Sequence, residues 1–133
     1  TELLGTSHFQ PVILVGVGNL GRALLSYRGF QKEGFRIVAA FDVREMAVSD
    51  KRITQPVLPM EKMPNTVREH TIRMAVLCVP PEEAQEVAND LVECGVTGIM
   101  NFAPTVLQVP DDVTVNNVNL AIELENLSYF VQQ

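Results

Sequence analysis

The pattern of hydrophobic positions along the chain predicts strands and helices in alternation. Residues 11–17 form a continuous apolar run rich in β-branched side chains, which is typical of a strand that a parallel sheet buries on both faces. From residue 20 to 27 the apolar residues recur at helical spacing, with Gly29 and Gly34 bracketing the end of this helix. A second apolar strand follows at 36–42. A strand, a helix and a parallel strand in so short a stretch predict a right-handed βαβ unit.

The second part of the chain resumes this alternation after a stretch with a poor pattern. Between residues 43 and 71, charges and prolines interrupt the apolar positions, and we expect only a weak edge strand around 56–59. A helix opens at Pro80 and Pro81 and ends at Gly95, because proline suits the first turn of a helix and glycine the position after its end. Further strands are predicted at 73–79, 96–102 and 113–118.

The last segment, residues 119–133, has the period of a helix and a large apolar surface. One stripe of this helix consists of Leu120, Leu124, Leu127 and Val131. Further apolar residues lie on its other sides, namely Ala121, Ile122, Tyr129 and Phe130. A single contact with the sheet cannot cover all of these side chains. We therefore expect the helix to pack against two surfaces and to hold a homodimer together.

This succession of elements predicts a Rossmann-type α/β fold, a doubly wound, mostly parallel sheet followed by a C-terminal dimerisation helix. A length of 133 residues suits one domain. We expect residues 1–10 to be the remnant of a linker, 11–118 to be the Rossmann domain and 119–133 to be the dimerisation helix. The sequence starts without a methionine, close to the first strand, so we interpret it as a fragment.

The glycines between the first strand and the first helix give the strongest functional signal. They match G-x-G-x-x-G, and they stand in the strand-to-helix context that this phosphate-binding turn requires. In this motif Gly16 permits the tight turn, Gly18 leaves room for a pyrophosphate, and Gly21 lets the helix lie close to the sheet. The alternative is that the glycines serve only a tight turn. We expect a ligand to contact the whole turn, which consists of Gly16, Val17, Gly18, Asn19, Leu20 and Gly21.

Asp42 ends the second strand, about twenty residues beyond the glycine turn, where a carboxylate accepts hydrogen bonds from the ribose hydroxyls of an adenosine. The same carboxylate would repel a 2′-phosphate. Asp42, with Val43 beside it, therefore predicts that the cofactor is NAD(H) rather than NADP(H). Arg44 is the opposing signal, because an arginine near this position can accommodate a 2′-phosphate. We favour the interpretation of Arg44 as a solvated charge in a loop.

The carboxyl ends of the later strands should complete the pocket, because ligands of open α/β sheets bind at that edge. We expect contributions from Val79 and Pro80 after one strand, and from Asn101, Phe102 and Ala103 after the next. Asn101 is a candidate hydrogen-bond partner for the nicotinamide half of the ligand. Its alternative role is to form the turn that follows the strand.

Composition narrows the classes of function. Hydrophobic residues make up 47% of the chain and charged residues 20%, as in a folded globular protein. A formal charge of −6 disfavours direct binding of DNA or RNA. Cys78 and Cys94 lack the spacing of a metal site, and we expect no disulfide and no metal. With neither a signal sequence nor a long apolar segment, the sequence predicts a cytoplasmic protein that does not contact membranes.

The chain is predicted to bind its ligand without turning it over, and hence not to be an enzyme. A dehydrogenase needs a substrate pocket and an acid or base near the nicotinamide, and a chain of this length has no second domain to supply them. We assign no chemistry to His8 or His70. Two alternatives remain, a fragment of an NAD-dependent oxidoreductase and a CoA-binding domain of the acyl-CoA synthetase type. Asp42 argues against the second, because it suits a free ribose diol better than a phosphorylated ribose.

With these residues in place, the sequence resembles the C-terminal domain of the Rex family of redox-sensing transcriptional repressors. The resemblance implies a homodimer that binds NADH and NAD⁺ competitively, releases operator DNA when NADH is bound, and exchanges its C-terminal helix with the partner subunit. The residues that carry the resemblance are 12–24, 37–42, 79–80, 84–88, 98–104, 117–124 and 129–130.

Two departures from the Rex pattern are visible. The N-terminal winged-helix domain that contacts DNA in this family is absent from the chain, so we expect these residues to sense NAD(H) and to reach operator DNA only through that domain. Asn119 stands where the family has an aspartate, which takes part in a redox-linked contact with a tyrosine corresponding to Tyr27. The departure puts the switching step in question. Asn119 has an alternative role as the N-cap of the last helix.

Overall fold

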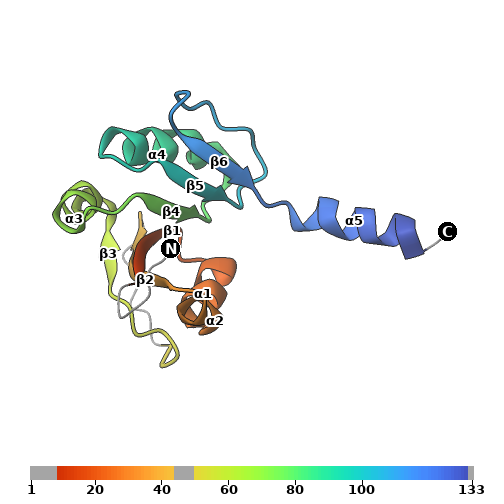
Figure 1. Cartoon of the computed structure of the whole chain (residues 1–133), viewed down its shortest axis with the longest axis horizontal. Helices are drawn as coiled ribbons and strands as arrows, with labels where there is room; N and C mark the ends of the chain where they lie inside the picture. Colours follow the sequence, from red (N-terminus) through yellow and green to blue (C-terminus); the bar gives the residue numbers. More distant parts are fainter. Residues whose placement is uncertain (1–8, 44–49, 132–133) are drawn as a thin grey trace.

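Six parallel strands form one sheet in the computed structural model, which describes residues 9–43 and 50–131 (Figure 1). The strand order is β3-β2-β1-β4-β5-β6, so the winding direction reverses between β1 and β4. This order, with every strand parallel to its neighbours, confirms the predicted Rossmann-type sheet. The strands are β1 (Gln10–Val15), β2 (Phe35–Asp42), β3 (Val57–Pro59), β4 (Met74–Leu77), β5 (Gly98–Asn101) and β6 (Thr114–Asn117).

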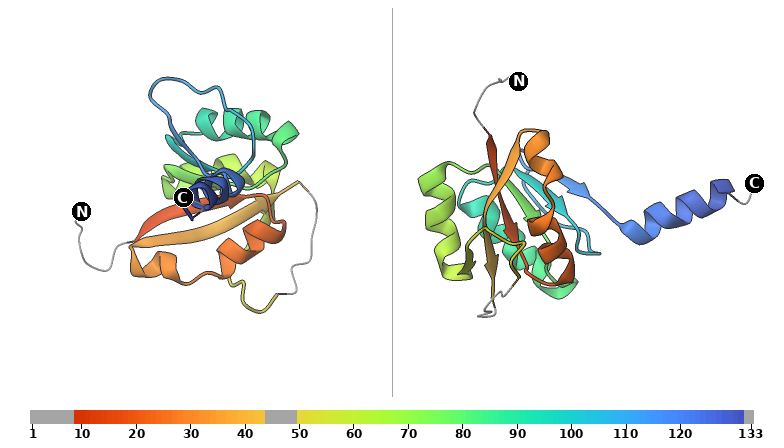
Figure 2. Two further views of the ribbon diagram at one scale, coloured as in Figure 1. Left: turned by 90° about the vertical axis from the view of Figure 1, so that its right-hand side faces the viewer. Right: turned by 90° about the horizontal axis from the view of Figure 1, so that it is seen from below.

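Helices cover both faces of this sheet. The side chains of α1 and α2 share one apolar cluster with the sheet, and those of α3 and α4 share another with its opposite face. Figure 2 shows the same layers from two further directions. A single turn of 3-10 helix, Met60–Lys62, leads into α3. The α-helices are α1 (Asn19–Ser26), α2 (Gly29–Lys32), α3 (Met63–His70), α4 (Pro81–Glu93) and α5 (Leu120–Val131).

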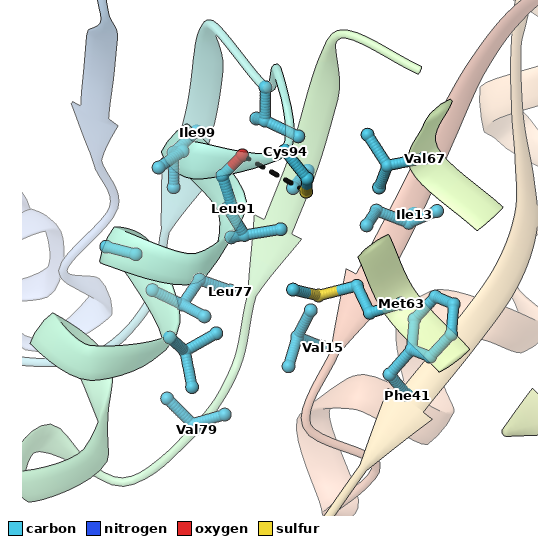
Figure 3. Close-up of a cluster of buried hydrophobic side chains, with 14 of the residues drawn as sticks. Ile13, Val15, Phe41, Met63, Val67, Leu77, Val79, Leu91, Cys94 and Ile99 are labelled. Carbon is cyan, nitrogen blue, oxygen red and sulfur yellow. Dashed lines mark hydrogen bonds between the residues drawn. The ribbon is translucent and has the colours of Figure 1, made fainter. Parts of the chain in front are cut away.

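The central strand β1 is apolar at nearly every position because both of its faces are buried. Ile13 and Val15 pack toward α3 and α4, while Val12 and Leu14 pack toward α1 and α2. Successive side chains of a strand point to opposite faces, so a strand covered on both sides needs no polar alternation. Figure 3 shows Ile13 and Val15 in the larger cluster, close to the sulfur-containing side chain of Met63. Each such buried side chain contributes roughly 1.5–3 kcal/mol.

The first helix is shorter than its sequence period predicts. It ends at Ser26, and Tyr27 is extended, with φ −76° and ψ 127°. A separate short helix, α2, follows from Gly29. The Tyr27 ring contacts Phe30 edge to face at a centroid distance of 4.9 Å, and a Cβ on Gly29 would overlap the Tyr27 ring. The apolar spacing continues through Tyr27 because that side chain folds over α2, not because the helix continues.

The prediction that residues 43–71 hold little beyond an edge strand was wrong in one respect. The edge strand is present as β3, but the helix α3 was missed. Only Met63 and Val67 of α3 are buried, and its other residues are largely polar. Two apolar positions one turn apart are too few to distinguish a helix from a loop. The strands β4, β5 and β6 are likewise shorter than predicted, because their flanking residues leave the ladder.

The helix α5 extends away from the body of the domain (Figure 1). All of its residues are exposed, including Leu124, Leu127 and Phe130. Asn119 caps it, since its Oδ1 accepts a hydrogen bond from the Ile122 N–H at 3.1 Å. This bond confirms the N-cap role that the sequence offered for Asn119. No other part of the described chain covers the apolar side chains of α5, so a second surface is needed to bury them.

Candidate functional site

In the glycine turn between β1 and α1, backbone segments lie so close together that there is no room for a side chain at Gly16 or Gly21. Gly16 has a φ of +103°, which favours glycine, and a Cβ there would lie 2.6 Å from the carbonyl carbon of Cys78. A Cβ on Gly21 would overlap the carbonyl oxygen of Gly16. Gly16 therefore permits the turn to touch the end of β4, and Gly21 permits α1 to lie against the turn. Both roles agree with those predicted from the sequence.

Gly18 is different, because open space lies in front of it. Among the described residues, no atom beyond the two chain neighbours of Gly18 lies within 4 Å of a Cβ built on it. This residue is the N-cap of α1, and no side chain caps that helix or places an acid in its first turn. The first N–H groups of an α-helix have no intrahelical partner and carry partial positive charge. An uncapped helix start that faces open space fits a bound phosphate or pyrophosphate.

Asp42 joins the end of β2 to this turn. Its Oδ2 accepts a hydrogen bond from the Val17 N–H at 2.7 Å, and the residue is only 6% exposed. A second bond, from the Gly16 N–H to the Phe41 carbonyl oxygen at 2.8 Å, runs beside it. The carboxylate predicted to bind a ribose thus also holds the backbone of the glycine turn.

A cleft of about 470 Å³ opens at the carboxyl ends of the strands, where the winding of the sheet reverses. The predicted site residues that line it are Gly16, Val17, Gly18, Asp42, Val43, Val79 and Pro80. The lining is completed by Val15, Met60, Cys78, Pro81, Glu83, Val87 and Pro104. Asp42 and Glu83 are the only charged residues among those lining residues that the structure describes, so the cleft offers a bound anion backbone N–H groups and no Lys or Arg side chain.

Six predicted site residues do not line this cleft. Asn19, Leu20 and Gly21 form the first turn of α1 and are not among the residues that line the cleft. Phe102 packs with the cluster on the α1 side of the sheet, and Ala103 is buried in the other cluster.

Asn101, the third residue of that later group, is fully buried and bonds within its own chain. Its Nδ2 lies 3.1 Å from the carbonyl oxygens of Ala103 and Thr105 and 3.0 Å from Asn117 Oδ1. Its Oδ1 accepts the Ala103 N–H at 3.0 Å. This geometry supports the turn-forming role of Asn101, because both ends of its amide already have partners.

Three of the lining residues that the sequence did not predict have polar or sulfur-containing side chains, namely Glu83, Met60 and Cys78. Glu83 follows the two prolines that open the predicted helix, and Met60 lies in the stretch with the poor pattern. Cys78 lines the cleft with a half-buried thiol, and burial raises its pKa to about 12. A thiol with so high a pKa is protonated at neutral pH and is a poor nucleophile.

The remaining features to consider are the cysteines, groups of metal ligands and membrane-spanning helices. Cys78 and Cys94 are both free, and burial also raises the pKa of the Cys94 thiol. Within residues 9–43 and 50–131, no three His, Cys, Asp or Glu side chains are grouped as metal ligands. No helix in these same ranges is long and apolar enough to span a membrane. Arg44 and His8 lie outside the described residues.

A second hollow, an apolar groove of about 570 Å³, lies on the α1 side of the sheet. Residues of β1, β2, β4, β5 and β6 line it, together with Leu24 of α1 and Phe30 of α2. Met100 is exposed there, and Phe102 and Met74 are half-buried. Its apolar lining includes Leu24, Phe30, Phe35, Met74, Met100 and Phe102. We refer to it below as the sheet-face groove.

Comparison with known proteins agrees with this geometry. Residues 9–105 match the family model of the CoA binding domain. The chain is 43% identical to the redox-sensing transcriptional repressor Rex of Carboxydothermus hydrogenoformans over 132 residues, which is 99% of this chain and 64% of that protein. It is 46% identical to Rex of Limosilactobacillus fermentum over 130 residues, 98% of this chain and 60% of that protein. The chain thus spans less than two thirds of the length of these relatives.

Solved structures of a Rex-family repressor are also similar to this chain. The crystal structure of RSP in complex with β-NADH superposes with a TM-score of 0.84 at 35% identity, covering 93% of this chain and 60% of that one. RSP, a Rex-family repressor, is also known with β-NAD⁺ and operator DNA. UDP-D-quinovosamine 4-dehydrogenase from Vibrio fischeri, at 17% identity and a TM-score of 0.55, shares the fold alone. The chain belongs to the CoA binding domain family and is homologous over nearly its whole length to the redox-sensing transcriptional repressors called Rex.

Proposed function

We propose that this chain is the NAD(H)-sensing and dimerisation domain of a redox-responsive transcriptional repressor. The observation that carries the proposal is its identity of 41–46% to Rex proteins over almost all of its residues. The uncapped helix start at Gly18 and the cleft beside it support a dinucleotide as the ligand. RSP has been solved with NADH and with NAD⁺, and the two forms of the dinucleotide compete for one site in our proposal.

The ligand is oriented by the glycine turn in this proposal. The pyrophosphate lies on the α1 start at Gly18, and the adenosine ribose lies near Asp42 at the end of β2. The nicotinamide half then extends across β1 toward Val79 and Pro80, at the end of β4. The structure describes no Lys or Arg in the cleft lining, which supports NAD(H) over a ligand with an additional phosphate.

Titration of the purified domain tests the proposal. NADH fluorescence should change saturably, NAD⁺ should displace NADH, and coenzyme A should fail to do so, because its ribose is phosphorylated. Displacement by coenzyme A but not by NAD⁺ would instead favour the CoA-binding alternative. An absence of any NADH binding would refute the proposed function.

The domain binds the dinucleotide without turnover in our proposal. Within the described residues, the cleft lining includes no His, Lys or Tyr that would act as acid or base beside the nicotinamide. The one thiol there, that of Cys78, has its pKa raised by burial to about 12. NADH absorbance should therefore remain constant on prolonged incubation with the domain. Steady oxidation of NADH would revive the interpretation as an oxidoreductase fragment.

The homodimer is held by α5 in this proposal. Its exposed apolar side chains match the sheet-face groove in character, and we propose that α5 of one copy packs into the groove of a second copy. If each copy does this to the other, a dimer with twofold symmetry buries the apolar side chains of both α5 helices and both sheet-face grooves. It also meets the expectation that the helix contacts more than its own sheet.

Operator DNA is contacted by a winged-helix domain outside this chain. The formal charge of −6 supports this division of labour, because an acidic domain repels the phosphate backbone. Residues 1–10 join the two parts, residues 11–118 sense the dinucleotide, and residues 119–133 form the dimer in this proposal. A regulator that acts on DNA works in the bacterial cytoplasm, which is the location we propose.

A further inference from the structure

We propose that Glu83 sets the relative affinity of the cleft for the two redox states of the dinucleotide by favouring NAD⁺ over NADH. This inference rests on the proposed function. The oxidised nicotinamide ring carries a positive charge, and the reduced ring is neutral. A fixed negative charge beside the ring therefore acts on one redox state only, whereas contacts with the adenosine and pyrophosphate act equally on both.

Glu83 lies on the side of the cleft where the proposed function puts the nicotinamide half of the dinucleotide. Glu83 lies in the first turn of α4, directly after β4, and it lines the cleft. Asp42, the other charged residue of the lining, lies at the end of β2. The sheet order puts β1 and the glycine turn between these two carboxylates. Because Asp42 marks the adenosine side, the other end of the dinucleotide extends toward Glu83.

Apart from its position near the positive end of the α4 helix dipole, the Glu83 carboxylate has no bonded partner among the described residues. It makes no hydrogen bond or ion pair in the part of the chain that the structure describes, although it is half-buried. A glutamate at this helical position often accepts a hydrogen bond from the N-cap backbone, but the N-cap here is Pro80, which has no N–H. No described Lys or Arg lines the cleft to neutralise it. Its charge is therefore available to a ligand.

Glu82 provides a matched control. It lies in the same first turn and carries the same charge near the same helix dipole, but it is exposed and does not line the cleft. Any effect of a lost carboxylate on the stability of α4 should be shared by Glu82→Gln and Glu83→Gln. An effect on the redox preference of the cleft should belong to Glu83 alone.

The test measures the dissociation constants of NADH and NAD⁺ separately by calorimetry for each variant. Glu83→Gln should weaken NAD⁺ binding relative to NADH by about threefold to tenfold, as expected for one charge pair several ångström apart near a protein surface. Glu83→Lys should shift the ratio further in the same direction, because it replaces attraction by repulsion. Glu82→Gln should leave the ratio unchanged, and thermal melts should show all three variants folded.

Two outcomes would overturn the proposal while leaving the proposed function intact. The ratio could stay at its original value in Glu83→Gln, whether or not both ligands weaken, or Glu82→Gln could shift the ratio as much as Glu83→Gln does. Equal weakening would indicate a contact with a part common to both ligands. If the unaltered domain binds neither NADH nor NAD⁺, the proposed function itself is wrong, which the first titration decides before any variant is made.

Discussion

The carboxylate of Asp42 and the backbone N–H of Val17 are joined by a buried hydrogen bond of 2.7 Å. This bond links the residue that we propose to bind the adenosine ribose to the turn that we propose to hold the pyrophosphate. Two features that the sequence presents as separate signals, an acid after one strand and a glycine turn after another, are thus one structural unit. A change at Asp42 should affect the turn as well as the ribose.

The first prediction follows from this bond. Asp42→Ala should lower the free energy of unfolding by about 1–3 kcal/mol, because the buried Val17 N–H loses its acceptor. Asp42→Asn retains an amide oxygen at the same place and should lose less stability. Urea unfolding of the two variants measures the difference. Equal stability of Asp42→Ala and the unaltered chain would show that the bond does not hold the turn.

Discrimination between NADH and NADPH is the second prediction. The domain should bind NADH more tightly by roughly tenfold or more, because the 2′-phosphate of NADPH would lie beside the Asp42 carboxylate without a described cation in the cleft. Fluorescence titration with both cofactors gives the ratio. Asp42→Asn should reduce it. Equal affinities in the unaltered domain would show that Arg44 accommodates the phosphate.

The third prediction separates binding from folding within the glycine turn. Gly18→Val should abolish dinucleotide binding but preserve the fold. Its Cβ meets no described atom beyond its chain neighbours within 4 Å, and its φ of −92° suits any residue. Gly21→Ala should instead destabilise the domain, because its Cβ would overlap the Gly16 carbonyl oxygen. Thermal melts and NADH titration of both variants test this contrast. Binding that survived in Gly18→Val would remove the pyrophosphate from the turn.

The fourth prediction concerns assembly. Leu127 and Phe130 are 59% and 73% exposed in the single chain, and burial of each contributes roughly 1.5–3 kcal/mol to a dimer. Replacing both with aspartate, or deleting residues 124–133, should convert the dimer to a monomer or an insoluble chain. Glu125→Gln, a change at an exposed polar position of the same helix, should remain dimeric. Light scattering that finds the unaltered domain monomeric at micromolar concentration would contradict the proposed dimer.

The sequence by itself determined the elements whose signals are local. The buried strand β1, the glycine turn, Asp42 and the amphipathic helices α4 and α5 follow from spacing and turn chemistry among near neighbours in the chain. These features are enough to predict the fold class, the cofactor and half of the cleft lining. The N-cap role of Asn119 is likewise a local matter, since a cap bonds within its own first turn.

The tertiary structure decided what depends on contacts between distant segments. The period of α3 is too weak to detect, and α3 is ordered because Met63 and Val67 pack in the core. The sequence left Asn101 with two roles, and the bond from its Nδ2 to Asn117 Oδ1 in the next strand supports the turn-forming one. Glu83 faces the cleft only because β4 lies next to β1, and strand order results from burial across the whole sheet, which no window of neighbouring residues contains.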